Sequence, residues 1–171
     1  IKDAIISSSQ KDIKNLWNVR NNTSTAFKTI PLRMNFDISV NLNLIQKFVA
    51  QLEKEILAFK EVKDILFFGH LGDNNLHAVV ICHELKEKIK KIFYKIVGEY
   101  NGSISAEHGI GLEKKAYLHL SRSKQEIKLM KDLKERFDPQ NILNRNRIFN
   151  SDLSYQKGLI KNNTNDELKE K

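Results

Sequence analysis

Two histidines and a later glutamate-histidine pair are the residues of this sequence best suited to chemistry. His70 and His77 lie at the two ends of a glycine-containing polar segment, and Glu107 and His108 follow later, next to glycines. Two neutral imidazoles and one carboxylate suit zinc or a similar divalent ion, and three protein ligands leave a coordination position open. An open position indicates catalysis, whereas the alternative is that both histidines are surface polar residues of a turn.

Arg20 is the next candidate, because it stands within the apolar stripe of a predicted helix. The stripe consists of residues three and four positions apart: Ile13, Leu16, Trp17, Ser24 and Phe27. A buried, unpaired guanidinium is costly. The simplest explanation is that Arg20 extends to the helix edge and pairs with a local carboxylate, and the spacing alone does not decide whether it has another role.

These residues need a scaffold, and hydrophobic periodicity predicts one of alternating helices and strands. The expected elements are a helix (9–27), a strand (34–40), a helix (45–56), two strands that form a hairpin (62–68 and 76–82), a helix (85–100) and a short strand (102–105). This β-α-β-β-α-β order is the split pattern of a ferredoxin-like plait. The expected fold class is therefore α+β: a ferredoxin-like antiparallel sheet with helices, followed by C-terminal helices.

The hairpin places His70 and His77 at its facing ends, close enough to share one ligand, but the position of Glu107 is harder to reconcile. In an ideal plait the fourth strand ends at the edge opposite the hairpin loop, which would hold Glu107 far from His70. Either the sheet departs from an ideal plait, or the fourth strand is shorter and the 106–111 loop returns to the site.

A capping-box signature predicts the C-terminal helix. Ser123 and Glu126 have the required spacing, and the Asp-Pro pair at 138–139 ends the helix. Beyond it the sequence becomes polar and loses its periodicity. We therefore expect one domain over residues 1–149, truncated at its N-terminus because the chain starts without Met, and a flexible polar tail over residues 150–171.

Cysteine content and hydropathy favour a protein of the cytoplasm. The lone Cys82 cannot form an internal disulfide, which fits a reducing compartment. No apolar run approaches the roughly 20 residues that cross a bilayer, and no secretory leader is recognisable. We expect a soluble, cytoplasmic protein without a transmembrane segment.

The net charge of +8 raises the possibility of nucleic-acid binding, but the composition argues against it. Of the 29 basic residues only six are Arg, and the Lys residues are spread along predicted helices, as on a solvated face. Proteins that read nucleic acids favour clustered Arg and stacking aromatics, and no strand resembles an RNA-recognition motif. We expect no nucleic-acid partner.

Five segments stand out in order along the chain: LWNVR (16–20), DISV (37–40), GHLGDNNLH (69–77), ISAEHGIG (104–111) and DPQNILN (138–144). Together they resemble the C-terminal domain of the FAD-linked oxidase family, the group of D-lactate dehydrogenase, the glycolate oxidase flavin subunit and D-2-hydroxyglutarate dehydrogenase. Each motif alone is modest, but their shared order and spacing over nearly the whole predicted domain are specific.

The resemblance implies a role for each candidate residue. His70, His77 and Glu107 match the family's divalent-metal ligands, and His108 matches the proposed general base, which also contacts substrate. Arg20 matches the residue that binds the substrate carboxylate, a role that suits a two-point guanidinium-carboxylate pair. Ser24, one helical turn on, would add a hydrogen bond to the substrate, and Asn144 would contact the flavin.

The implied cofactors are FAD, held mainly by an N-terminal domain that this sequence lacks, and a divalent metal, expected to be zinc. The implied reaction oxidises a small 2-hydroxy acid to a 2-oxo acid: the metal polarises the hydroxyl group, the histidine takes its proton, and the flavin accepts hydride. A separately encoded flavin domain is an expected partner, and the chain alone is expected to be inactive.

Several positions depart from the family pattern. Asn74 replaces the usual Gly, although Asn tolerates a left-handed backbone, so the turn is expected to survive. Asn35 replaces an expected Lys, and Val79 replaces a polar Asn, which argues against a long diacid substrate. In the closing segment, residues 144–147, only the first residue, Asn144, matches the family pattern. The alternative interpretation is therefore a non-catalytic metal-binding fragment of a split or decaying gene.

Overall fold

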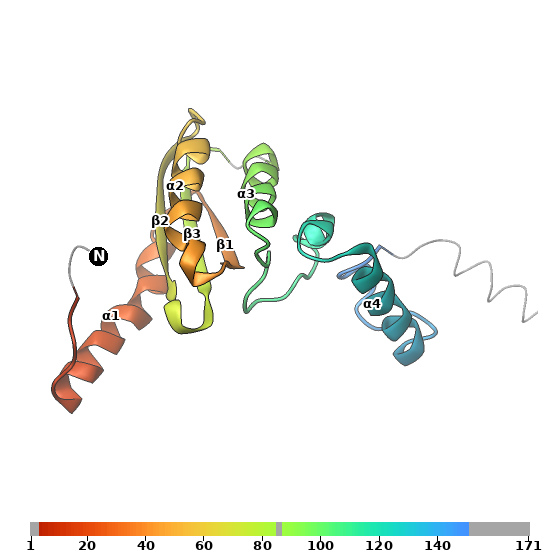
Figure 1. The fold of residues 1–171 in the computed structure, drawn as a ribbon, viewed down its shortest axis with the longest axis horizontal. Helices are drawn as coiled ribbons and strands as arrows, with labels where there is room; N and C mark the ends of the chain where they lie inside the picture. Colours follow the sequence, from red (N-terminus) through yellow and green to blue (C-terminus); the bar gives the residue numbers. More distant parts are fainter. Residues whose placement is uncertain (1–3, 85–86, 151–171) are drawn as a thin grey trace, which may run out of the picture.

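The structure is a computed structural model that describes residues 4–84 and 87–150, without the side chains of Ser24 and Leu71. Its elements are α1 (Gln10–Lys28), β1 (Arg33–Ser39), η1 (Leu42–Leu44), α2 (Ile45–Ile56), β2 (Val62–His70), η2 (Leu71–Asp73), β3 (Asn75–Cys82), α3 (Glu87–Glu99), η3 (Lys115–Leu120) and α4 (Lys124–Phe137) (Figure 1). The expected α+β class is confirmed. Apart from Asn150, the tail predicted over residues 150–171 lies outside the described residues.

The sheet is antiparallel and has the strand order β1-β3-β2, with the expected hairpin formed by β2 and β3. The fourth strand expected at residues 102–105 is reduced to a single bridge, in which Ser39 and Ser103 exchange backbone hydrogen bonds of 3.0 and 2.9 Å. The strand stops there, and the following N–H groups bind side chains: Ile104 binds the Ser121 hydroxyl, Ser105 binds the Ser103 hydroxyl, and residues 106–108 bind the Asp37 carboxylate. Of the two alternatives for Glu107, the short strand with a returning loop is therefore correct.

Strand alternation assigns one face of the sheet to the hydrophobic core. Met34, Phe36 and Ile38 of β1 project to this face, where α2 and α3 cover them (Figure 1). The Phe36 and Phe93 rings stack with centroids 3.7 Å apart, and Phe48 and Leu52 of α2 are fully buried. Because successive side chains of a strand point to opposite faces, the other face remains available for polar groups.

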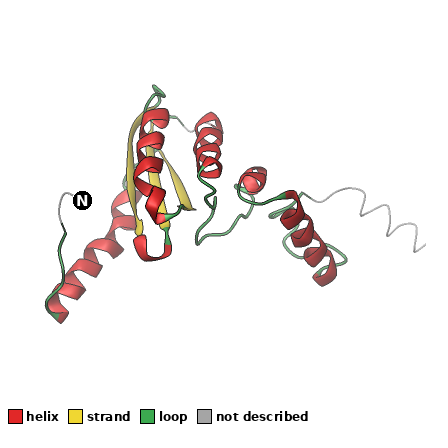
Figure 2. Cartoon of the chain, in the orientation of Figure 1, coloured by secondary structure: helices red, strands yellow, loops and turns green. Residues whose placement is uncertain are grey.

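Helix α1 reaches that second face mainly with its C-terminal half, together with Trp17, whose ring centroid lies 6.5 Å from that of His70. The Phe27 ring lies 5.3 Å from the Phe68 ring of β2. The rest of the predicted stripe is not buried, since Leu16 is 40% exposed and Trp17 is 53% exposed. The N-terminal half of α1 extends away from the sheet (Figure 2), so its apolar side chains have no core to join within the described residues.

The C-terminal segment has the predicted local structure but little contact with the core. Ser123 and Glu126 form the full capping box at the start of α4, and the helix ends at Phe137. No residue of α4 is buried, and Phe137 is 81% exposed. Among the described residues, no helix combines the length and the apolar character that spanning a membrane requires.

Gly69 marks a close approach of β2 to β3 beside the candidate histidines. A Cβ atom at this position would lie 2.2 Å from the backbone oxygen of Asn75, so Gly69→Ala should push the two strands apart. We expect a loss of about 1–3 kcal/mol in the free energy of unfolding, as for other overpacked sites, measured by urea denaturation. Gly72→Ala is the matched control, because its Cβ would meet nothing within 4 Å. Equal stability of the two variants would refute the constraint.

Candidate metal and substrate site

The candidate site lies on the sheet face opposite α2 and α3. Directly paired residues of antiparallel strands project from the same face, so the strand register assembles the polar residues into rows. Asp37, His77 and Phe68 form one row, and Ser39, Asn75 and His70 form the next.

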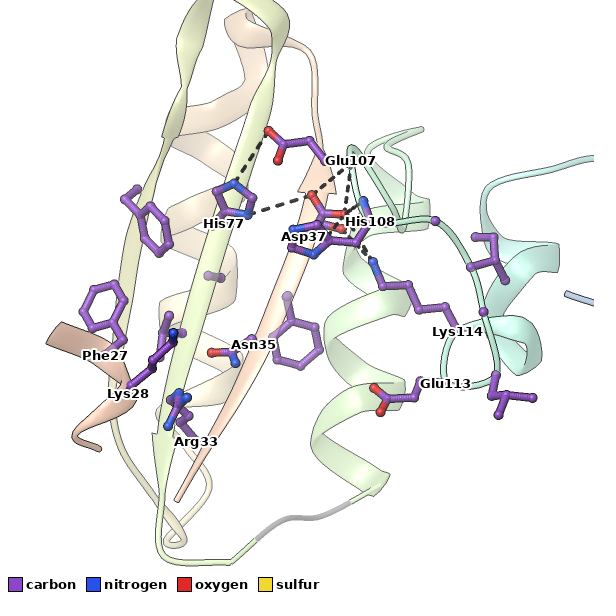
Figure 3. A pocket seen from close by; sticks show the side chains of 18 of the residues that line it. Phe27, Lys28, Arg33, Asn35, Asp37, His77, Glu107, His108, Glu113 and Lys114 are labelled. Carbon is purple, nitrogen blue, oxygen red and sulfur yellow. Dashed lines mark hydrogen bonds and ion pairs between the residues drawn. The ribbon is translucent and has the colours of Figure 1, made fainter. Parts of the chain in front are cut away.

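His77, at the centre of its row, lies between two carboxylates (Figure 3). Its Nε2 atom is 3.9 Å from a carboxylate oxygen of Glu107, and its Nδ1 atom is 3.8 Å from Oδ1 of Asp37. Asp37, His77 and Glu107 each offer one ligand atom within 4.8 Å of the others. Two of the three predicted metal ligands are therefore brought together by the structure.

The third predicted ligand, His70, lies one row away and contacts Arg20 instead. Its Nε2 atom is 2.9 Å from a guanidinium nitrogen of Arg20. Because a guanidinium can only donate hydrogen bonds, Nε2 of His70 is the acceptor here. Asn75, which pairs with His70 across the strands, donates a hydrogen bond to Glu107 and so links the two rows.

Asp37 is a site residue that the sequence analysis recognised only as part of a strand motif. Its carboxylate is 3% exposed and accepts hydrogen bonds from the backbone N–H groups of Ala106, Glu107 and His108. Burial alone would raise the pKa of the Asp37 carboxyl, but these N–H groups and the Lys114 ammonium outweigh it, so the pKa lies below its usual value. The only sequence signal was a carboxylate at a strand position between two buried hydrophobic residues.

The environment of His77 favours the neutral imidazole. Burial lowers its pKa below the ordinary histidine value, and the charges of Asp37 and Glu107 offset only part of this effect. A metal ligand must be the neutral form of histidine. His77 is thus in the protonation state that a metal site needs.

A cleft of about 620 Å³ joins four of the predicted site residues. Arg20, His77, Glu107 and His108 all line it, and Phe68 and Val79 belong to its apolar part. The His108 side chain is 66% exposed, and its ring lies parallel to that of His77 at 5.8 Å. The Nε atom of Arg20 is buried and has no hydrogen-bond partner among the described residues. The cleft therefore offers an unused donor and an accessible imidazole to a ligand.

Three predicted site residues are not placed in this cleft: His70, which lies at a neighbouring pocket, Ser24 and Asn144. The side chain of Ser24 lies outside the described residues, so its predicted contact with substrate stays a prediction. Asn144 is exposed, has a left-handed backbone with φ of 47°, and does not line the cleft. Asn74 was expected to preserve the hairpin turn by adopting a left-handed backbone in place of Gly. This prediction is confirmed, because its φ is 58°.

Comparison with known proteins gives consistent matches over most of the chain. The sequence model of the FAD linked oxidases, C-terminal domain, matches residues 1–148. A D-2-hydroxyglutarate dehydrogenase of Stutzerimonas stutzeri is 35% identical over 158 residues, which cover 87% of this chain and 34% of the relative. A D-2-hydroxyglutarate–pyruvate transhydrogenase of Saccharomyces cerevisiae is 34% identical, covering 84% and 31%. A putative mitochondrial D-lactate dehydrogenase of Schizosaccharomyces pombe is 33% identical, covering 84% and 30%. The chain thus spans about a third of these relatives.

Proposed function

Because the chain belongs to the FAD linked oxidases, as a C-terminal domain of that family, we propose that it forms the substrate- and metal-binding part of an FAD-dependent D-2-hydroxyacid dehydrogenase. The complete enzyme would oxidise a 2-hydroxy acid to a 2-oxo acid. The observation that carries this proposal is the cleft in which Arg20, His77, Glu107 and His108 meet. A cation, two imidazole rings and a carboxylate around one cavity suit an anionic substrate whose hydroxyl group must lose a proton.

The residues present fit a divalent metal, for which we propose zinc. Two ligands about 2.1 Å from a tetrahedral ion lie about 3.4 Å apart, and His77 and Glu107 are already separated by 3.9 Å. His70 would complete the set after releasing Arg20, which would then be free for the substrate. When bound, the metal would supply Lewis-acid polarisation of the substrate hydroxyl.

Arg20 would bind the substrate carboxylate, with Ser24 as a second contact from the next helical turn. Its guanidinium has a buried, unused donor and lies over the Phe68 ring at 5.3 Å, which limits its freedom. A carboxylate in the cleft would take the hydrogen bond that His70 accepts here. The substrate would thereby replace a protein contact with a stronger, charge-assisted one.

His108 would take the proton of the substrate hydroxyl. Its ring is exposed to the cleft, and its Nδ1 atom is 3.8 Å from Asp37, a carboxylate that would stabilise the imidazolium formed. Histidine is the side chain that most often serves as a general base. The hydride from the carbon that bears this hydroxyl group would be accepted by FAD, which supplies the redox chemistry.

FAD would be held mainly by a separate domain, encoded in the same protein or as another chain. The sequence has no glycine-rich phosphate-binding loop, and the described cleft is lined for a small anion rather than a dinucleotide. The exposed apolar residues of α1 and α4, such as Trp17 and Phe137, offer surfaces against which such a domain would pack. Asn144 would then reach the flavin from the segment after α4.

A small substrate such as D-lactate or glycolate is the proposed choice. Val79 and Asn35 line the cleft; compared with the family pattern, Val79 lacks an amide and Asn35 lacks a positive charge with which a long diacid could be bound there. Two of the three relatives described above carry D-2-hydroxyglutarate in their names, so a substrate panel must include it. A cytoplasmic location is proposed from the lone Cys82, and one of these relatives is named as mitochondrial.

The test combines this chain with the part of the Stutzerimonas stutzeri relative that it does not match, first as a fusion protein and then as two separate chains. We expect dye reduction that depends on a 2-hydroxy acid, disappears with EDTA and returns with zinc, whereas the chain alone should be colourless and inactive. Stoichiometric flavin absorbance of the chain alone would contradict the division of roles. A fusion that binds FAD and metal but oxidises no 2-hydroxy acid would favour the alternative, a non-catalytic metal-binding fragment, which the departures at Asn35 and Val79 support.

Arg20→Lys should lower kcat/KM of the reconstituted enzyme by about 10- to 100-fold. Lysine cannot form the planar two-point contact with the substrate carboxylate. A hydrogen bond to a charged group contributes about 1.5–3 kcal/mol, which sets the size of the expected loss. The melting temperature should hardly change, because Arg20 is only partly buried. Arg122→Lys, on the exposed turn before α4, is the matched control. If Arg20→Lys unfolds the domain without changing catalysis, Arg20 has a structural role only.

A further inference from the structure

The carboxylate of Asp37 is surrounded by hydrogen-bond donors, most of which contact one oxygen, Oδ2. Three consecutive backbone N–H groups converge on it, from Ala106 at 3.2 Å, Glu107 at 3.1 Å and His108 at 2.9 Å. The Ser105 hydroxyl lies 3.1 Å from the same oxygen, Oδ2. Consecutive N–H groups around one anion form a preorganised cradle, and here the anion belongs to the protein itself.

Lys114 closes this arrangement from the other side (Figure 3). Its ammonium group is 3.4 Å from Oδ2 of Asp37, 3.2 Å from the backbone oxygen of Asp37 and 3.0 Å from the Ser105 hydroxyl. The Lys114 side chain is only 12% exposed, so the pair is largely removed from water. A buried charge is tolerated when it is paired and hydrogen-bonded, and both charges meet this condition.

Asp37 lies close enough to His77 and Glu107 to be a third ligand, but it faces the other ring nitrogen of His77. Glu107 faces Nε2 of His77, whereas Asp37 faces Nδ1. The two ring nitrogens point in different directions, so a metal bound between Nε2 and Glu107 would lie away from Asp37. A carboxylate behind a metal-binding histidine orients the ring and raises its basicity.

We propose that Asp37 is the positioning residue of this site: one buried carboxylate, held by Lys114, sets the 106–108 loop so that Glu107 faces His77 while His108 faces the cleft. The inference rests on the proposed function for the roles of Glu107 and His108. It also explains how the loop after Ser105 is held beside β1, since the N–H groups of residues 106–108 bind the side chain of Asp37.

The experiment compares the wild-type chain with Asp37→Asn, Lys114→Met and the control Asp64→Asn, which changes an exposed aspartate of β2. Amide hydrogen exchange of residues 106–108 and titration with Co²⁺ are the two measurements. In Asp37→Asn we expect these amides to exchange at least about tenfold faster and the Co²⁺ dissociation constant to rise about 10- to 100-fold. The Co²⁺ absorption bands should keep their positions, because the ligands are unchanged.

Each result has a defined meaning. Unchanged exchange at 106–108 in Asp37→Asn would overturn the proposal, and so would shifted Co²⁺ bands, which would make Asp37 a ligand. If the wild-type chain binds no Co²⁺, the proposed metal site fails, while the exchange data still decide the positioning role. If Asp37→Asn does not fold, Lys114→Met carries the test, with a smaller loosening of about two- to tenfold in the same amides and protected β3 amides as the folding check.

Discussion

Replacing His108 by glutamine should lower kcat of the reconstituted enzyme by about 10²- to 10⁴-fold, the usual contribution of a general base. Glutamine keeps a polar side chain of similar size but cannot take up the proton of the substrate hydroxyl. Because the His108 side chain is 66% exposed, the substitution should leave the melting temperature nearly unchanged. Steady-state kinetics with D-lactate and glycolate would measure the effect.

The matched control for this prediction is His119→Gln, which changes an exposed histidine of η3. Co²⁺ affinity provides a second check, since His108 is not among the proposed metal ligands and its loss should leave the dissociation constant within about twofold. An enzyme that retains most of its kcat after His108→Gln would show that another group accepts the proton.

Replacing His77 by alanine should weaken metal binding by about 10²- to 10³-fold. Structural zinc sites with four ligands bind with about 10–16 kcal/mol, so one ligand contributes roughly 3 kcal/mol, or about two powers of ten. The activity of the reconstituted enzyme should fall in parallel and recover partly at high zinc concentration. Isothermal titration with zinc measures the loss directly.

The affinity of this site for metal should also depend on pH. Protonation of His77 removes a ligand, so metal affinity should fall as the pH falls through the pKa of this histidine. Burial lowers that pKa, so the wild-type chain should keep its metal to a lower pH than an ordinary imidazole would allow. His83→Ala, at an exposed histidine after β3, is the control. Equal metal affinity in His77→Ala and His83→Ala would show that His77 is not a ligand.

The sequence by itself determined the local elements and most of the sheet. The period-2 pattern of residues 34–40 and the apolar runs on either side of the 69–75 turn predicted β1, β2 and β3 close to their observed bounds. Helices α2 and α4 could be predicted equally well, because side-chain spacing and capping depend only on residues a few positions apart in the chain. The two histidines were placed at the facing ends of the hairpin; His70 does end β2, whereas His77 is the third residue of β3 and pairs with Phe68.

Burial of α1 could not be predicted in the same way. Its stripe of Leu16 and Trp17 has the spacing of a core-facing helix, but a helical pattern shows only that one face is apolar and not what covers it. In the described residues α1 meets the sheet through Phe27, Arg20 and an edge contact of Trp17 with His70, while Leu16 and Trp17 stay largely exposed.

Only the tertiary structure decided which polar residues meet. The sequence analysis grouped His70 with His77 and Glu107, whereas the strand register places His70 one row away and puts Asp37 directly opposite His77. Antiparallel pairing between β1 and β3 joins residues 40 positions apart, and the loop that carries Glu107 returns because its N–H groups bind the Asp37 side chain. Such contacts depend on long-range register and on the satisfaction of buried polar groups, which no local spacing encodes.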